Sequence, residues 1–246
     1  YTAMLANNGS GGGNITLTAG STSGDIRLNQ SALQALGTLS LTAAGGNLYA
    51  KGIALQANAM VLNAKGDITG DVSDSTAFLL AATTLDARST GVGKLRLSTN
   101  GALDALYLGT VSGTITMEAA GNLIARDVNA GSQDVTLRTP LLNANGVAFN
   151  NGTTLRRMTL GQVVGGTVTL NAGTDAQQLS GSTVTANRLV LTANAATALT
   201  GLNVAAVDAE IARVGGLSLG ITGTGATALE RLLTLDGGIS VDSTRS

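Results

Sequence analysis

Three aspartates stand close together between residues 67 and 74, where their carboxylates could supply oxygen ligands to a metal ion. Asp67, Asp71 and Asp74 lie on a short stretch that also contains glycine and serine, and Ca²⁺ prefers oxygen ligands of this kind. The spacing matches neither the EF-hand loop nor the glycine-rich calcium repeat of solenoid proteins. We therefore interpret these residues as solvated carboxylates of a turn, and we predict neither a metal site nor a cofactor.

Hydrolysis of a glycan requires two carboxyl groups that face each other across the scissile bond. The chain has only three glutamates, none of them in an acidic cluster: Glu118, Glu210 and Glu230. Glu118 precedes Arg138 by an interval that would make the two neighbours on adjacent turns of a solenoid with the same period. An external ion pair explains such a pairing, and we predict no catalytic residues.

Histidine and cysteine are both absent from the 246 residues. Their absence excludes Ser-His-Asp and Cys-His catalysis, histidine-ligated metals and disulfides. The net charge is −1, from 14 basic and 15 acidic residues without a basic patch, so nucleic-acid binding lacks its electrostatic basis. No apolar run approaches the roughly 18 residues of a membrane-spanning helix, and we expect no membrane insertion.

The remaining motifs are weak. Residues 9–13 lack the flanking strand and helix of a phosphate-binding loop, and residues 91–94 depart from the P-loop pattern because Leu95 replaces its Ser or Thr. Arg126 and Asp127 are not part of an Arg-Gly-Asp motif. Four glycosylation sequons are attributed to chance in this composition: Asn8, Asn14, Asn29 and Asn151. Four aromatic residues are too scattered for a sugar-binding platform: Tyr49, Tyr107, Phe78 and Phe149.

Short triplets with an apolar-polar-apolar order recur along the whole chain. The elements that they form would have to position any catalytic or ligand-binding side chain. This alternation predicts strands with one buried and one exposed face. The triplets begin at Ile15, Ile26, Leu39, Ile53, Met60, Leu95, Ile115, Val135, Met158, Val168, Leu189, Leu217 and Ile239.

The spacing of the triplets indicates a repeat. Leu95, Ile115 and Val135 follow one another at equal intervals, and Leu39 precedes Met60 by nearly the same interval. A period near 20, divided into short strands, is typical of one coil of a β-solenoid.

Glycine followed by Asn or Asp and then an aliphatic residue marks corners between the strands, since both residue types suit tight turns. The motif occurs at Gly13, Gly24, Gly46, Gly66 and Gly121. Pro140 is the only proline, which suits strands that need every N–H for pairing.

The composition agrees with a narrow core of stacked layers. Hydrophobic residues make up 43% of the chain but aromatic residues only 2%, so small and branched aliphatic side chains must fill the interior. We predict an all-β fold, a right-handed single-stranded parallel β-helix of about 12 coils of about 20 residues and about 55–60 Å in length. A two-sheet sandwich is the structural alternative.

We expect residues 1–246 to form a single β-helix segment, an internal fragment of a longer protein. The period breaks near 71–90 and 142–157, where we expect irregular loops. Loops of this kind are the usual carriers of specific binding.

The repeats resemble those of filamentous haemagglutinin-type exoproteins of the two-partner secretion pathway. The resemblance rests on residues 13–20 (GNITLTAG), 39–48 (LSLTAAGGNL) and 168–173 (VTLNAG), and it extends over most of the chain as a pattern. These large Gram-negative adhesins have a rod that is a right-handed parallel β-helix. The Asn-Pro signature of their N-terminal secretion domain is absent, so the resemblance implies a segment of the shaft.

The resemblance implies secretion through an outer-membrane transporter partner and display on the surface of a Gram-negative bacterium. The expected function is a structural rod that supports cell–cell, biofilm or host adhesion, without enzyme activity. The alternatives are a carbohydrate- or protein-binding module that recognises a surface glycan or protein receptor, a contact-dependent toxin-delivery rod, a polysaccharide-processing β-helix and a phage tail-spike segment.

Overall fold

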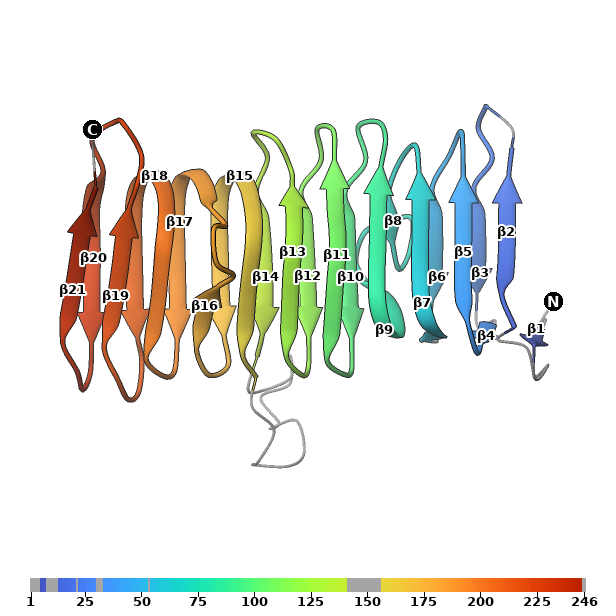
Figure 1. Ribbon diagram of the computed structural model, residues 1–246. Helices are drawn as coiled ribbons and strands as arrows, with labels where there is room; N and C mark the ends of the chain where they lie inside the picture. Colours follow the sequence, from blue (N-terminus) through green and yellow to red (C-terminus); the bar gives the residue numbers. More distant parts are fainter. Residues whose placement is uncertain are drawn as a thin grey trace.

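The protein forms a parallel β-solenoid of about ten turns of roughly 21 residues each, seen in a computed structural model (Figure 1). The structure describes residues 5–7, 13–20, 22–29, 33–52, 54–140 and 156–244. Every strand pairing within these ranges is parallel, and each strand pairs with strands of the adjacent turns. A two-sheet sandwich of antiparallel strands is therefore excluded.

The described strands range from 2 residues in β8 to 15 residues in β15 and β18. The first ten are β1 (Leu5–Asn7), β2 (Ile15–Ala19), β3 (Ile26–Asn29), β4 (Leu33–Ala35), β5 (Thr38–Ala43), β6 (Leu48–Lys51), β7 (Leu55–Ala64), β8 (Ile68–Thr69), β9 (Phe78–Ser89) and β10 (Leu95–Thr99). The remainder are β11 (Leu103–Thr110), β12 (Ile115–Ala119), β13 (Leu123–Asn129), β14 (Val135–Thr139), β15 (Met158–Ala172), β16 (Ala176–Gln178), β17 (Val184–Ala193), β18 (Thr197–Ile211), β19 (Leu217–Ile221), β20 (Ala228–Thr234) and β21 (Ile239–Ser243).

The predicted spacing is confirmed by the register of the strands. Leu95 in β10 pairs with Ile115 in β12, which pairs with Val135 in β14, and Leu39 in β5 pairs with Met60 in β7. Triplets that are only about half a period apart, such as those at Ile15 and Ile26, do not pair with each other. They belong to two separate stacks of strands. The front stack contains β2, β5, β11 and β13, and the rear stack contains β3, β6, β10, β12 and β14 (Figure 1).

The core is a set of aliphatic columns that run along the rod. Ile115, Val135, Val168 and Leu189 stack in successive turns, and each has an exposed fraction of 0%. Because each inward side chain meets its equivalents in the turns above and below, similar small aliphatic residues fill the interior without large rings. Phe78 is the exception and is itself fully buried.

The Gly-Asn/Asp motif forms a ladder of hydrogen bonds at one corner of the solenoid. The Oδ1 atom of Asp25 accepts the backbone N–H of Asn47 at 2.9 Å, Oδ1 of Asn47 accepts that of Asp67 at 2.7 Å, and Oδ1 of Asp67 accepts that of Lys94 at 3.0 Å. The same contact recurs at this corner from Asp134 to Thr167. It also occurs at a different corner, before β2 and β13, from Asn14 to Thr38 and from Asn122 to Arg157. Each Asn or Asp therefore fixes the position of the following turn.

Glycine is required at this corner by the close stacking of the turns. A Cβ on Gly66 would lie 2.1 Å from Oδ1 of Asn47, and a Cβ on Gly113, at the equivalent place in a later turn, would lie 1.9 Å from the carbonyl oxygen of Gly93. Neither Gly66 nor Gly113 has a positive φ. The sequence predicts glycine here because it tolerates the backbone conformation of a tight turn. At Gly66 and Gly113 the structure shows a different reason, which is that neighbouring turns approach too closely for a Cβ.

Two turns are longer than the repeat, and this accounts for about ten turns in place of the predicted 12. Ile68 pairs with Leu95 across the long loop between β8 and β9. Val135 pairs with Val168 across the long interval between β14 and β15. At a strand separation of about 4.8 Å, ten turns give a rod of about 48 Å. The handedness stays a prediction.

The expected irregular segment 71–90 is a loop only in its first part. Residues 78–89 form the long strand β9, because Phe78, Leu80, Leu85 and Ala87 all reach the core. The second expected loop, 142–157, lies outside the described residues up to residue 155.

Candidate functional site

The loop between β8 and β9 contains the aspartates singled out as possible metal ligands. Asp71 accepts hydrogen bonds from the backbone N–H of Ser75 at 3.0 Å and from its hydroxyl at 2.7 Å, and from the hydroxyl of Ser73 at 3.1 Å. These hydrogen bonds, with those from Ser75 foremost, hold the pKa of Asp71 far below its ordinary value. The carboxylate of Asp71 therefore stabilises the loop by hydrogen bonds to other residues of the same loop.

The other two aspartates bind protein groups of their own. Asp74 forms an ion pair with Lys94 at 2.7 Å, and its φ of 55° is a left-handed conformation that Asp tolerates better than most residues. Asp67 belongs to the corner ladder. Within the described ranges, no group of three or more acidic residues is placed to hold a metal ion.

Glu118 and Arg138 lie in register on β12 and β14, as their spacing in the sequence predicts. No ion pair between them is formed, although both residues belong to the described part of the chain. Arg138 instead lines a cavity of about 330 Å³ together with Arg96, Thr116 and Thr136. This cavity lies on the rear stack of strands. The described residues that line it include no pair of carboxylates suited to glycan hydrolysis.

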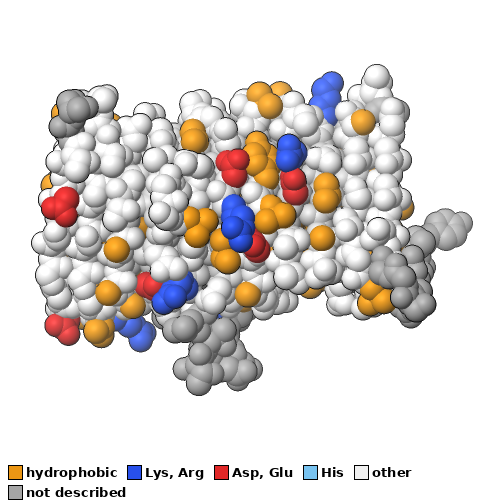
Figure 2. Space-filling model, viewed as in Figure 1, with side chains coloured by type: hydrophobic (Ala, Val, Ile, Leu, Met, Phe, Trp, Pro, Cys, Tyr) orange, Lys and Arg blue, Asp and Glu red, His pale blue; other side chains and the backbone are white. Residues whose placement is uncertain are grey.

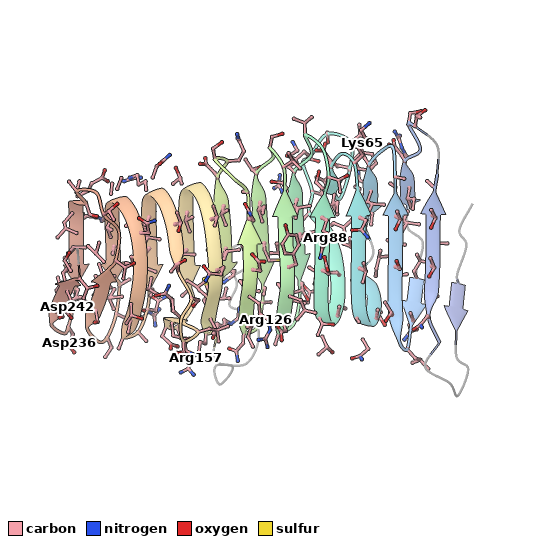
Figure 3. All side chains as sticks on the ribbon, turned by 45° about the horizontal axis from the view of Figure 1, so that its top comes forward. Lys65, Arg88, Arg126, Arg157, Asp236 and Asp242 are labelled. Atoms are coloured by element: carbon pink, nitrogen blue, oxygen red, sulfur yellow. The ribbon has the colours of Figure 1, made fainter. Side chains whose placement is uncertain are left out.

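Several ion pairs connect neighbouring turns along the outside of the rod. Arg126 binds Asp104 through two hydrogen bonds of 2.7 and 2.8 Å, and Arg157 binds Asp175 at 2.8 Å. Lys65, Arg88, Arg126 and Arg157 come from different turns (Figure 3). On the face shown in Figure 2, charged side chains are sparse, and several Lys or Arg side chains lie beside an Asp or Glu.

A third set of charges lies near the C-terminal turns. Arg188 pairs with Glu230 at 2.7 Å, across an intervening turn, and Arg231 pairs with Asp208 at 2.8 Å and with Glu210 at 3.0 Å. Both guanidinium groups are exposed, so solvent screens these ion pairs and each contributes little to stability. These ion pairs, which join two arginines to three carboxylates, connect neighbouring turns.

The three aromatic residues in the described ranges do not form a platform. Tyr49 and Tyr107 lie under the guanidinium groups of Arg27 and Arg88, at 5.4 and 4.4 Å from the ring centres, and Phe78 is in the core. Residues 91–94 are part of the turn between β9 and β10. Asn8, Asn151, Phe149 and most of residues 9–13 lie outside the described residues.

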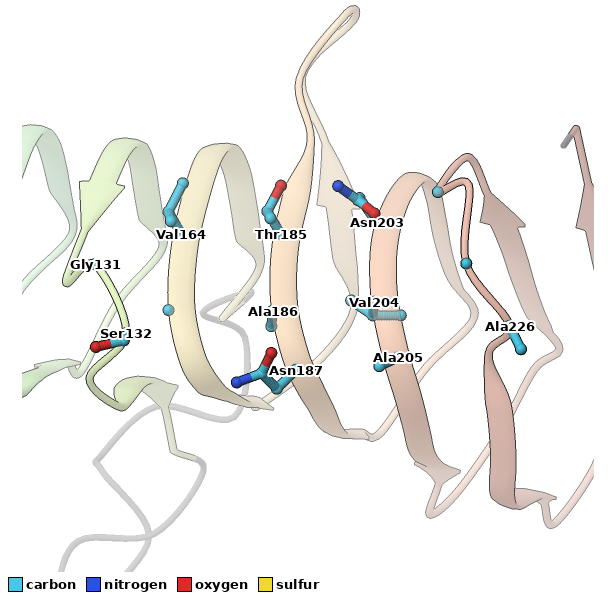
Figure 4. Close-up of a pocket in the computed structure, with 13 residues that line it drawn as sticks. Gly131, Ser132, Val164, Thr185, Ala186, Asn187, Asn203, Val204, Ala205 and Ala226 are labelled. Carbon is cyan, nitrogen blue, oxygen red and sulfur yellow. The ribbon is translucent and has the colours of Figure 1, made fainter. Parts of the chain in front are cut away.

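A groove that sequence reasoning missed crosses the C-terminal half of the rod (Figure 4). In most turns a loop connects the front stack to the rear stack, as residues 130–134 and 222–227 do. In the three turns between these two loops, β15, β17 and β18 run through the corner without interruption. Without loops, the surface at this corner lies closer to the axis of the rod. A cavity of about 470 Å³ remains there between the flanking loops.

The described residues that line the groove are all uncharged. Val164, Thr185 and Asn203 stand in register along one side, and Asn187 lies across the floor from them (Figure 4). Ser132 and the glycines of the flanking loops form the two ends. Within the described part of the chain, the side chains of Asn187, Asn203 and Thr185 have no hydrogen-bond partner.

The spacing of apolar residues holds the signal that would have revealed this groove. Leu108 and Ile115, both buried, are separated by a loop. Val163 and Val168, which are also buried, are separated only by residues 164–167, and the equivalent residues of β17 have the same spacing. So short an interval leaves no room for a loop at the corner.

The structure contains no helix in its described ranges and so none that could cross a membrane. Comparison with family models, curated proteins and solved structures finds no match to this chain.

Proposed function

We propose that this chain is a structural rod segment of a large secreted bacterial surface adhesin, which holds other modules away from the cell. The observation that supports this proposal most directly is the aliphatic core, which continues through every turn from Ile15 to Ile221. A continuous core gives the molecule one long axis and a uniform cross-section. A spacer between a cell and its target needs both properties.

The contacts between turns suit a mechanical role. The strands β15, β17 and β18 each pair over most of their length with strands of the preceding and the following turn. In the earlier turns, the corner ladder adds side-chain hydrogen bonds from one turn to the next. Separating two turns therefore breaks many hydrogen bonds together, and the rod resists extension and proteolysis.

The proposed partner is an outer-membrane transporter of the two-partner secretion pathway, and the proposed location is the surface of a Gram-negative bacterium. Support comes from the resemblance of the repeats and from the local character of the fold. Strand pairing is confined to adjacent turns, so a chain that crosses a narrow pore unfolded can form its turns one after another on the far side.

Export can be tested with a chimaera. Residues 1–246 would follow the secretion domain of a two-partner exoprotein, and the matching transporter would be expressed in a Gram-negative host. We expect the chain outside the cell, in a protease-resistant form. A matched variant with a charge in the core, Ile115→Asp, should cross the membrane but be degraded by added protease.

Retention of the wild-type chimaera in the periplasm, with the secretion domain alone exported normally, would contradict the proposed route. If the wild-type chimaera were exported but were as sensitive to protease as the Ile115→Asp variant, the proposed rod structure would be contradicted. The two results are separate, because the first concerns passage and the second concerns folding.

A further inference from the structure

We propose that the corner groove of β15, β17 and β18 binds an uncharged linear oligosaccharide, with the sugar chain laid along the axis of the rod. The inference does not rest on the proposed function, because a rod whose groove is empty remains a rod. It rests on the length of the groove, on its lack of charge and on its unpartnered amide and hydroxyl groups.

The dimensions of the groove favour an extended polymer. Four strand separations lie between the loop 130–134 and the loop 222–227, a distance of about 19 Å at about 4.8 Å each. An extended β-linked chain of pyranose rings advances by close to one strand separation per ring. The loops themselves take up part of this distance, so about three rings fit between them, one for each uninterrupted turn.

The lining chemistry matches sugar hydroxyl groups. An Asn side chain offers two donors and an acceptor, and a Thr hydroxyl offers both functions, as each sugar hydroxyl does. Asn187, Asn203 and Thr185 stand on opposite sides of the floor, without partners among the described residues. Polar groups on both sides of a plain floor can bond both edges of a flat ring.

The floor itself is small and mostly buried. Ala186 and Val204 have exposed fractions of 8% and 5% and pair in register with Gly165. A Cβ on Gly165 would approach Cγ2 of Val135 to 2.9 Å, so packing alone explains that glycine. The flat floor follows instead from the missing loops. Val164 and Ala205 beside it are more exposed and offer apolar surface to a sugar ring.

Acidic ligands do not fit this site. Among the described residues, no Lys or Arg lines the groove, and the residue after Asn187, Arg188, has its guanidinium bound to Glu230 at 2.7 Å. Sulfated or carboxylated glycans, phosphates and nucleic acids would enter without a compensating charge. The ligand class is therefore neutral.

An extended peptide is disfavoured for a geometric reason. Peptides that bind as strands add to an exposed edge of a sheet, whereas β17 is paired with β15 on one side and with β18 on the other. A peptide also advances by about 3.3 Å per residue, which does not match the separation of the turns. The repeat of the floor fits sugar rings better than amino acids.

Isothermal titration of the folded chain can test the proposal. The probes are a panel of neutral linear oligosaccharides, with cellohexaose, xylohexaose, mannohexaose and chitohexaose, together with an acidic oligogalacturonate and an extended neutral peptide. We expect at least one neutral oligosaccharide to bind, and neither the acidic glycan nor the peptide.

Variants place the binding in the groove. Asn187→Ala and Asn203→Ala should each weaken it about fivefold, as expected for loss of one or two hydrogen bonds, and Ala205→Leu should weaken it by narrowing the groove beside the floor. Asn58→Ala is the matched control, since Asn58 is also an exposed amide on a strand but lies on β7. It should leave the affinity unchanged.

Failure of every neutral probe to bind would overturn the proposal. So would preferential binding of the acidic glycan or the peptide, or an affinity that the groove variants leave unaltered. Small-angle scattering of each variant shows whether the rod is intact, so a failure of the groove is distinguishable from a failure of the rod.

Discussion

At the scale of single residues, one pair of adjacent side chains does two separate tasks at the solenoid corner. The glycine allows the turns to approach, as at Gly66, and the Asn or Asp that follows accepts a backbone N–H from the next turn, as Asn47 does for Asp67. An alanine in place of the first would push the turns apart, and an alanine in place of the second would leave an N–H without its partner. The motif is thus a contact between turns as well as a signal for a bend.

The corner glycines give the first prediction. We expect Gly113→Ala to destabilise the protein by about 2 kcal/mol, because the new Cβ would lie 1.9 Å from the carbonyl oxygen of Gly93. Urea denaturation followed by circular dichroism measures the change. Gly101→Ala is the control, since a Cβ there meets nothing within 4 Å, and equal effects of the two substitutions would disprove the close approach.

The loop aspartate gives a prediction of pH dependence. Hydrogen bonds from Ser75 lower the pKa of Asp71 in the folded state, whereas in the unfolded chain it is about 3.9. The stability that this carboxylate contributes is therefore fully present above about pH 4 and is lost as the pH falls from there towards the folded pKa. Between about pH 5 and pH 2, the thermal midpoint of the wild type should fall more than that of Asp71→Asn.

The hydroxyl of Ser75 supplies the control for this effect. In Ser75→Ala the pKa of Asp71 should rise towards its ordinary value, as an NMR titration of the carboxyl carbon would show. An Asp71 that already titrates at its ordinary value in the wild type would refute the assignment.

At the scale of elements, the strands were predictable because their signal is local. Triplets such as those at Leu95, Ile115 and Val135 alternate apolar and polar residues, and their spacing gives the register directly. The boundaries of the long strands were not predictable in the same way. Thr197 and its neighbours lie on β18, which runs through a corner that carries no Gly-Asn/Asp motif.

The groove was missed for a related reason. Reasoning from motifs looks for groups that are present, and it pointed to loops at 71–90 and 142–157. The groove exists because loops are absent at three consecutive corners of the described chain, and its polar residues, such as Asn187 and Thr185, belong to no motif in the sequence. Only a comparison of spacing between successive turns would have revealed it.

The buried columns give a prediction at this scale. Leu170 on β15 has an exposed fraction of 0%, and we expect Leu170→Ala to destabilise the protein by about 3 kcal/mol through lost burial and the cavity left behind. The adjacent outward residue gives the control, because Thr169→Ala should change stability by less than about 0.5 kcal/mol. Similar values for the two would mean that β15 does not alternate as described.

At the scale of the whole molecule, the aspect ratio is the property most open to measurement. About ten turns separated by about 4.8 Å give a long axis of about 48 Å for the stacked strands. Small-angle X-ray scattering should give a maximum dimension of at least that length, with the cross-section of a single solenoid. A compact, isotropic particle is the result that this structure forbids.

The final turn predicts self-association of the isolated chain. β20 and β21 pair on one side only within the described residues, and Leu229, Leu233 and Ile239 in them are 47%, 48% and 44% exposed. An open parallel edge with apolar side chains pairs readily with another strand. Sedimentation should show association that increases with concentration and is reduced by Ile239→Lys, whereas Thr169→Lys, far from the edge, should leave it unchanged.

The corner ladder, in which Asp25, Asn47 and Asp67 each fix the following turn, also sets a direction of assembly. The Oδ1 atom of Asn47 accepts the N–H of Asp67, which arrives later in the chain, and Asp67 then does the same for Lys94. A completed turn is thus a template for its successor, much as the end of a growing crystal is for the next layer. Lengthening such a chain by duplicating a turn adds a layer without redesigning the layers already present.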